Sequence, residues 1–139
     1  MNPSPTPACD GSGQHVALVS GASRGIGRAV ARHLARMGCR VAVNYLHSED
    51  AAREVTDEIA ASGGEAMMFR ADVGKPAGVT ELVASVNSAW GPVDVLVANA
   101  GVNLTQPLAM TPPEAWRSVL AANLDSAFLL TKAVASGMT

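Results

Sequence analysis

The sequence alternates short apolar runs, rich in β-branched residues, with longer segments of helical period, and this alternation constrains the fold most strongly. Strands are predicted at His15–Ser20, Arg40–Asn44, Glu65–Arg70 and Val93–Ala98, the third of these being the weakest. The first is apolar almost throughout, as is typical of a strand that helices cover on both faces of a parallel sheet. Four such runs in one chain therefore predict a buried parallel sheet.

Apolar residues recur at helical spacing in the intervening segments. The predicted stripes lie within Ile26–Met37, Ala52–Ile59 and Val79–Trp90, with a fourth helix running toward Ser136. Start signals precede the last three helices: Ser48 as an N-cap, Pro76 at a first turn, and Thr111 with Glu114 as a capping box. Gly38, Gly63-Gly64 and Gly91-Pro92 follow the first three helices as stop signals.

Strands that alternate with helices predict the α/β class, a doubly wound parallel sheet of Rossmann-like type, because crossovers between parallel strands are right-handed. Residues 1–14 are rich in Pro and Gly and are expected to form a flexible leader. Residues 15–139 are expected to form one continuous domain.

Composition argues against several classes of partner. The 139 residues include 10 basic and 12 acidic side chains, a net charge of -2, so no strong positive field favours nucleic acid or anionic membrane. Cys9 and Cys39 lie in unlike settings that suit neither a disulfide framework nor a metal cluster. We expect no metal site and a cytoplasmic location.

The strongest chemical signal is the segment Gly21-Ala22-Ser23-Arg24-Gly25-Ile26-Gly27, between the first strand and the first helix. Glycine permits a turn that other residues resist, and a helix N-terminus presents unpaired N–H groups to an anion such as a pyrophosphate. The alternative is a glycine-rich turn that only joins strand to helix. The spacing G-x-x-x-G-x-G differs from the general dinucleotide fingerprint.

With Ser20 to Gly27, Asp72-Val73, Ala98-Asn99-Ala100-Gly101 and Asn123 in this order, the chain resembles the short-chain dehydrogenase/reductase family over residues 15–139. The resemblance is to its members of the 3-oxoacyl-(acyl-carrier-protein) reductase type. Two residues depart from the family pattern: Ser20 stands for Thr, which keeps a hydroxyl, and Ala98 stands for Asn, which removes a bracing amide.

The resemblance implies that residues 15–139 form an NAD(P)-binding domain, truncated after about four strands and so incomplete at its C-terminus. It places a dinucleotide site at the carboxyl ends of the strands, where open α/β sheets bind ligands in general. The turn would contact the phosphates and adenosine ribose, Asp72-Val73 the adenine, and residues 99–101 the nicotinamide half. The implied cofactor-binding residues are Gly21, Ser23, Arg24, Gly25, Ile26, Gly27, Asp72, Val73, Asn99, Ala100 and Gly101.

The end of the second strand bears on the choice between NAD and NADP. A carboxylate there would bind the ribose 2′-OH and repel a 2′-phosphate, whereas this chain has Asn44. Asn44 is therefore added to the cofactor-binding set, with Arg24 as a partner for the phosphate, which favours NADP over NAD. Arg24 as a solvated surface residue is the alternative.

The family's proton donor, a Tyr with a Lys four residues later, has no counterpart here. Tyr45 is the single tyrosine, and Glu49 lies four residues after it. The resemblance assigns a catalytic relay role to Asn123 alone, and an ordinary polar role in the helix is the alternative. We expect a truncated half that does not turn over by itself, although the complete enzyme would act on a small carbonyl or alcohol.

Truncation would also leave surface uncovered. Leu120, Leu124, Phe128 and Leu130 on the last helix would lose partners, as would one side of the fourth strand. We therefore expect a homo-oligomer or a partner chain that covers the last helix and the open sheet edge. The competing hypotheses are a non-catalytic dinucleotide-binding or interaction module and a non-functional product of a shortened reading frame.

Overall fold

The computed structural model of the chain describes residues 14–138. Four strands form one parallel sheet in this range: β1 (Val16–Val19), β2 (Arg40–Tyr45), β3 (Glu65–Arg70) and β4 (Val95–Val97). Their order across the sheet is β3-β2-β1-β4, so β1 lies between β2 and β4. The predicted α/β class is confirmed. All but one of the residues predicted as a leader lie outside the described range.

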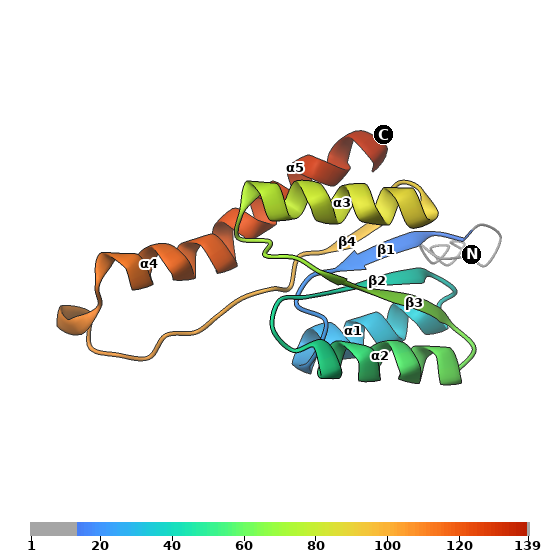
Figure 1. Ribbon diagram of the computed structural model, residues 1–139, viewed down its shortest axis with the longest axis horizontal. Helices are drawn as coiled ribbons and strands as arrows, with labels where there is room; N and C mark the ends of the chain where they lie inside the picture. The colour runs from blue at the N-terminus through green and yellow to red at the C-terminus, as the bar shows by residue number, and fades with distance from the viewer. Residues whose placement is uncertain (1–13, 139) are drawn as a thin grey trace, which may run out of the picture.

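Helices cover both faces of the sheet (Figure 1). The helices α1 (Gly25–Arg36) and α2 (Glu49–Ala61) lie on one face, and α3 (Pro76–Trp90) and α5 (Ser126–Met138) lie on the other. Parallel strands need a crossover connection, so each helix returns the chain to the end of the sheet where the next strand begins. As a result, all four strands point their carboxyl ends in one direction.

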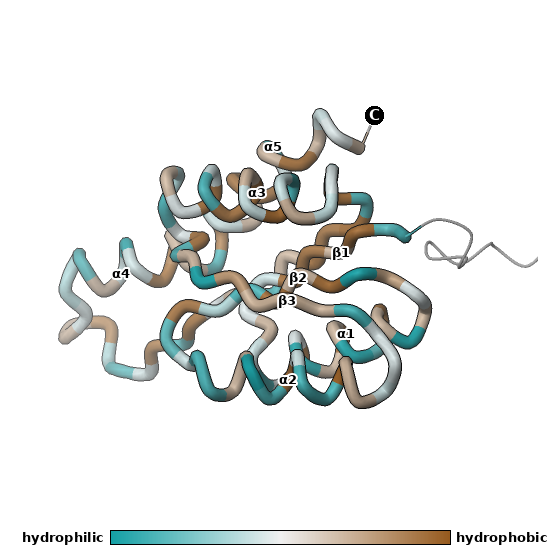
Figure 2. Tube along the Cα trace, turned by 45° about the vertical axis from the view of Figure 1, so that its right-hand side comes forward, coloured by the Kyte–Doolittle hydropathy of each residue, from teal (hydrophilic) through white to brown (hydrophobic). Residues whose placement is uncertain are grey.

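Alternating side chains of the strands fill two separate cores, as the two-residue period of a strand requires. Val19, Val41 and Tyr45 pack toward α1 and α2, whereas Leu18 and Ala42 pack toward α3 and α5. The side chains of Leu18, Val19 and Val41 are fully buried. The strands form the most hydrophobic layer of the molecule, between more hydrophilic helices (Figure 2).

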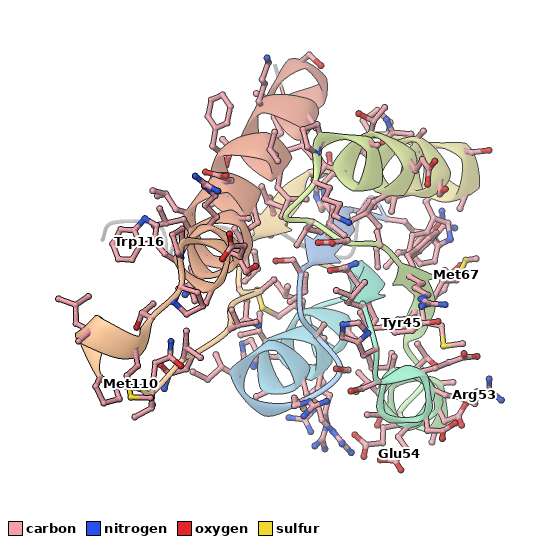
Figure 3. The ribbon with its side chains drawn as sticks, turned by 60° about the vertical axis from the view of Figure 1, so that its left-hand side comes forward. Tyr45, Arg53, Glu54, Met67, Met110 and Trp116 are labelled. Carbon is pink, nitrogen blue, oxygen red and sulfur yellow. The ribbon has the colours of Figure 1, made fainter. Side chains whose placement is uncertain are left out.

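After β4 the chain leaves the sheet. It passes through the short helix η1 (Leu108–Met110), then α4 (Pro113–Leu120) and the π-helical segment η2 (Ala121–Asp125), which leads without a break into α5. We call residues 102–125 the arm, which extends away from the sheet in Figure 1. Trp116 of α4 points away from the sheet in Figure 3.

Several local predictions are wrong. The expected capping box is absent, because α4 begins at Pro113 after Pro112, with no side-chain cap, and the Thr111 hydroxyl donates to the Pro107 carbonyl instead. Ser48 does precede α2, but its side chain makes no capping bond. Cys39 is buried and takes part in a disulfide, against expectation; Cys9 lies outside the described residues.

The continuous helical stretch Pro113–Met138 is long and apolar enough to cross a membrane by length and composition, with a mean hydropathy of 1.2 over its most apolar window. This one helix is weak evidence for a membrane span, because helices that pack inside soluble proteins meet the same criterion. Asp125 and Lys132 interrupt its apolar residues.

Candidate functional site

A cavity of about 470 Å³ lies at the carboxyl ends of the strands. Residues that follow all four strands line it, which is the place where open α/β sheets bind ligands. Its lining is Gly21, Ser23, Arg24, Asn44, Tyr45, Leu46, His47, Ser48, Asp72, Val73, Gly74, Asn99, Ala100, Gly101, Val102 and Ala122. A second cavity, between α1 and α2, has only about 20 Å³.

The turn after β1 packs directly against the turn after β4. Gly21 has a φ of 61°, and a Cβ added there would lie 2.9 Å from the Cα of Ala100. A Cβ on Gly27 would lie 2.5 Å from the Asn99 side-chain nitrogen and equally close to the Gly21 carbonyl. These two glycines therefore allow the first turn of α1 to pack on both loops.

Hydrogen bonds from Ser20 and Asn99 hold the two turns together. The Ser20 hydroxyl oxygen accepts the N–H groups of Asn99 and Ala100, both at 3.0 Å. The Asn99 amide donates to the carbonyls of Ser20 and Gly21, both at 3.1 Å. Ala98 is exposed and has no side-chain amide. The bracing that the resemblance assigned to that position therefore comes from Ser20 and Asn99.

The N-terminus of α1 presents its backbone donors at this end of the sheet. Arg24 is its N-cap and makes no capping bond, and the Arg28 N–H bonds to the Arg24 carbonyl at 3.2 Å. The N–H groups of Gly25, Ile26 and Gly27 precede this first intrahelical bond and lack helical acceptors. With no acidic residue in the first turn, the helix end suits an anion such as the phosphates of a dinucleotide.

A second group of polar side chains follows β2. The exposed Arg24 guanidinium donates to the Ser48 hydroxyl, which joins the first turn of α1 to the start of α2. His47 is exposed beside Ser48 and lines the same cavity. Within residues 14–138, neither Arg24 nor His47 forms an ion pair with an acidic side chain.

The loop after β3 is held by its own carboxylate. Asp72 accepts the Gly74 N–H at 3.0 Å and lies 3.7 Å from the Lys75 ammonium. Val73 is buried beneath it, at 6% exposed. Among the described lining residues, Asp72 is the one carboxylate, and part of its charge is already balanced.

Asn123 joins η2 to the chain after β4. Its side-chain oxygen accepts the Val102 N–H at 2.6 Å, and its amide donates to the Val102 carbonyl at 2.9 Å. A Cβ on Gly101 would lie 2.9 Å from the same Asn123 oxygen. Asn123 thus holds the start of the arm against the helix, at the margin of the cavity.

Most of the predicted site residues meet in the cavity. Gly25, Ile26, Gly27 and Asn123 do not line it. Gly25 follows the lining residue Arg24, Asn123 follows Ala122, and Gly27 packs closely against Gly21 and Asn99. The lining residues that sequence reasoning missed are Tyr45, Leu46, His47, Ser48, Gly74, Val102 and Ala122. Those at 45–48 follow a predicted strand, so the rule on carboxyl ends would have found them. In residues 14–138 no three His, Cys, Asp or Glu residues form a metal-binding group.

Comparisons with known proteins agree with this geometry. A curated relative named 3-oxoacyl-(acyl-carrier-protein) reductase, from Synechocystis sp., is 45% identical over 123 residues, 88% of this chain and 50% of the relative. A metagenomic short-chain oxidoreductase solved in complex with NADP has a TM-score of 0.84 at 40% identity, over 89% of this chain and 56% of that one.

A blue fluorescent protein from a metagenomic library, solved in complex with NADPH, has a TM-score of 0.84 at 36% identity, over 89% of this chain and 51% of that one. The chain thus spans about half the length of the proteins it matches. The family described as short chain dehydrogenase matches residues 15–139. On this match, and on the order of its motifs around the cavity, the chain belongs to the short-chain dehydrogenase family.

Proposed function

We propose that this chain is the cofactor-binding half of an NADP-dependent oxidoreductase, whose complete form interconverts carbonyl and alcohol groups. A 3-oxoacyl thioester is the proposed substrate, since relatives such as the Synechocystis protein are named for that reduction. The observation that supports the proposal is the cavity, where the loops after all four strands converge beside the donor-rich end of α1.

The chain's own residues divide the binding task. The N–H groups of Gly25, Ile26 and Gly27 bind the phosphates, with Gly21 and Ser23 in the turn before them. Asp72 and Val73 contact the adenine, and Asn99, Ala100 and Gly101 hold the nicotinamide half, the Asn99 amide by bracing the turn. The bound nicotinamide supplies the hydride.

NADP is proposed over NAD because the cavity offers a cation and little opposing negative charge. Arg24 lines it and lacks an acidic partner in residues 14–138, and Asp72 already bonds to Gly74 and Lys75. An arginine fork matches the oxygens of a charged phosphate and binds a neutral ribose hydroxyl of NAD more weakly.

Binding is the test. We expect the 139-residue chain to bind NADPH in a calorimetric titration, and Arg24→Glu to weaken that binding about tenfold or more, as loss of a charge-assisted phosphate contact predicts. Arg117→Glu makes the same charge change on exposed α4, outside the cavity, and serves as the matched control. Equal NADPH affinity in the two variants would overturn the proposed site.

The chain is proposed not to turn over by itself. Its single tyrosine, Tyr45, is buried at the end of β2 without the Lys that proton donation in the family requires, so Asn123 remains as one relay residue. We expect no consumption of NADPH when the purified chain meets a 3-oxoacyl thioester. Steady consumption that Arg24→Glu abolishes would contradict this expectation.

The second candidate function, a dinucleotide-binding or interaction module, is favoured by exposed apolar surface. Leu124 and Phe128 are each 63% exposed, and β4 lies at the edge of the described sheet. For either function, we propose that a second copy of the chain or a partner chain covers this surface. Sedimentation of the purified chain tests this proposal, because a chain that stays monomeric at all concentrations would contradict the homo-oligomer.

Two further expectations stand as proposals. Residues 15–139 form one incomplete domain after a leader of residues 1–14. Limited proteolysis tests this proposal, because the first cut should then fall within the leader. The location is cytoplasmic, which cell fractionation tests. The disulfide at Cys39 gives that location no support, because disulfides are rare in reducing compartments.

A further inference from the structure

Asn123 lies in the π-helical turn η2, between the α-helices α4 and α5. Its side chain bonds to the N–H and the carbonyl of Val102, and a Cβ on Gly101 would lie 2.9 Å from its oxygen. A π turn carries one residue more than an α-helical turn, and one residue rotates a helix by about 100°. The direction of the Asn123 side chain therefore depends on whether η2 keeps its π form.

Ser126, the first residue of α5, bonds to two successive carbonyls of this turn. Its backbone N–H donates to the Ala121 carbonyl, five residues earlier, which is the π-helical bond. Its hydroxyl donates to the Ala122 carbonyl at 2.6 Å. Ser126 is 2% exposed, so its hydroxyl has little access to water. A serine hydroxyl that bonds back to a carbonyl four residues earlier can bend a helix, and here it stabilises the π form.

The loop after β3 contacts the same turn through Gly74. A Cβ added to Gly74 would lie 3.3 Å from the carbonyl carbon and oxygen of Ala121, and 3.2 Å from a carboxylate oxygen of Asp72. These distances are shorter than ordinary van der Waals contact, so a side chain here would displace the loop or the turn. Asp72 holds the loop by accepting the Gly74 N–H at 3.0 Å. Glycine thus leaves the Ala121 carbonyl the room in which it accepts the Ser126 N–H.

We propose that Ser126 and Gly74 are positioning residues for Asn123: they fix the π turn, and the turn directs the Asn123 side chain at the chain after β4. This inference rests on the proposed function, because Asn123 has a relay role only in the complete oxidoreductase. Ser126 does not line the cavity, so its effect on the site passes through Asn123.

The first test is Ser126→Ala in the 139-residue chain, followed by hydrogen exchange resolved by NMR. Without the hydroxyl, the Ala122 carbonyl loses a donor and the π form loses stability relative to an α-helical turn, which would point Asn123 away from Val102. We expect exchange at the Val102 N–H to accelerate about fivefold, with no change in β1. Ser118→Ala, on the exposed surface of α4, is the matched control and should leave Val102 exchange unchanged.

A double-mutant cycle separates positioning from a general loss of stability. Asn123→Ala alone should also accelerate exchange at Val102, because the accepting oxygen is gone. If Ser126 acts through Asn123, combining the two substitutions should give about fivefold in total. Independent effects would multiply to about 25-fold, and that result would overturn the inference. Equal acceleration at Val102 and in β1 of Ser126→Ala would also overturn it.

Gly74→Ala tests the second contact. We expect it to accelerate Val102 exchange about twofold or more, because the new methyl group crowds the Ala121 carbonyl. Gly137→Ala is the matched control: its Cβ would lie 3.2 Å from the Pro92 Cβ, on α5 and outside the cavity. Unchanged exchange in Gly74→Ala would contradict the role of Gly74, and unchanged exchange in both variants would overturn the inference while the proposed function stands. A chain that binds no NADPH would contradict the proposed function alone, since the exchange experiments need no cofactor.

Discussion

The strand ends and loops that line the cavity differ from the arm in how their polar groups are bonded and their apolar groups are buried. At the carboxyl ends of the strands, Ser20, Asn44 and Asn99 each make two or more hydrogen bonds that join segments distant in sequence. The apolar residues that precede Ser20 and Asn44, Val19 and Val43, are fully buried. In the arm, Leu108 is 83% exposed and Trp116 is 58% exposed, and the two hydrogen bonds between Asn123 and Val102 join the two ends of the arm itself.

The difference follows from which contacts each region makes within the described chain. The loops end strands that lie between two helical layers, so sheet pairing and packing determine their positions together. The arm follows β4, the edge strand of the described sheet, and leads into α5, which packs on α3. Regions with few buried apolar contacts open at low free-energy cost. We therefore expect the loops at the strand ends to open together with the sheet, and the arm to open separately from it.

The strongest way to break the comparison is to weaken the sheet itself. Leu18 is fully buried in the central strand β1, and Leu18→Ala should lower the free energy of unfolding by about 2–5 kcal/mol through lost burial and a residual cavity. Urea denaturation measures the change. A loss below about 1 kcal/mol would show that the sheet is not the rigid part of this chain.

The next effect concerns the loop bonds. Ser20→Ala leaves the partly buried N–H groups of Asn99 and Ala100 without their acceptor and should cost about 2 kcal/mol of unfolding free energy. Ser20→Thr, which keeps the hydroxyl, is the matched control. If the alanine variant were as stable as the threonine variant, these bonds would not be what holds the two turns together.

The fold could be predicted from the sequence because the spacing of apolar residues indicates which faces of each strand or helix are buried. The run His15–Ser20 predicts a strand, and the structure places β1 at Val16–Val19, in the middle of the sheet. Leu130, by contrast, was expected to lack partners and is fully buried against α3. A helix stripe in the sequence gives the apolar face but not which neighbour covers it.

The position of the candidate site in the fold could be predicted from the sequence, whereas the side chains that line it could be predicted only in part. The rule on strand ends brought Asp72 and Asn99 to the cavity correctly, because it depends only on topology. The bonds of Asn44 to the carbonyls of Phe69 and Ala71 depend on β3 lying beside β2, which no local pattern encodes. Side-chain direction at a strand end needs the three-dimensional neighbours.

A smaller effect would sharpen the boundary between loops and arm. Asn123→Ala removes two exposed bonds to Val102 and should cost about 1 kcal/mol, since water replaces the lost partners in part. Hydrogen exchange should accelerate at Val102 and in the arm, and stay unchanged in β1. Asn123→Asp keeps the accepting oxygen and should protect the Val102 N–H. Equal acceleration in β1 would mean that arm and sheet open as one unit.

The smallest effect on stability is expected on the exposed side of α5. Phe128 is 63% exposed, so Phe128→Ser should change the unfolding free energy by less than about 0.5 kcal/mol, whereas Leu130→Ser on the same helix buries a hydroxyl and should cost several times more. If this face binds a second chain, Phe128→Ser should also lower the sedimentation coefficient at high concentration. A large loss of stability from Phe128→Ser would mean that the Phe128 side chain packs within its own chain. The exposed apolar surface would then be confined to the arm and would not continue onto α5.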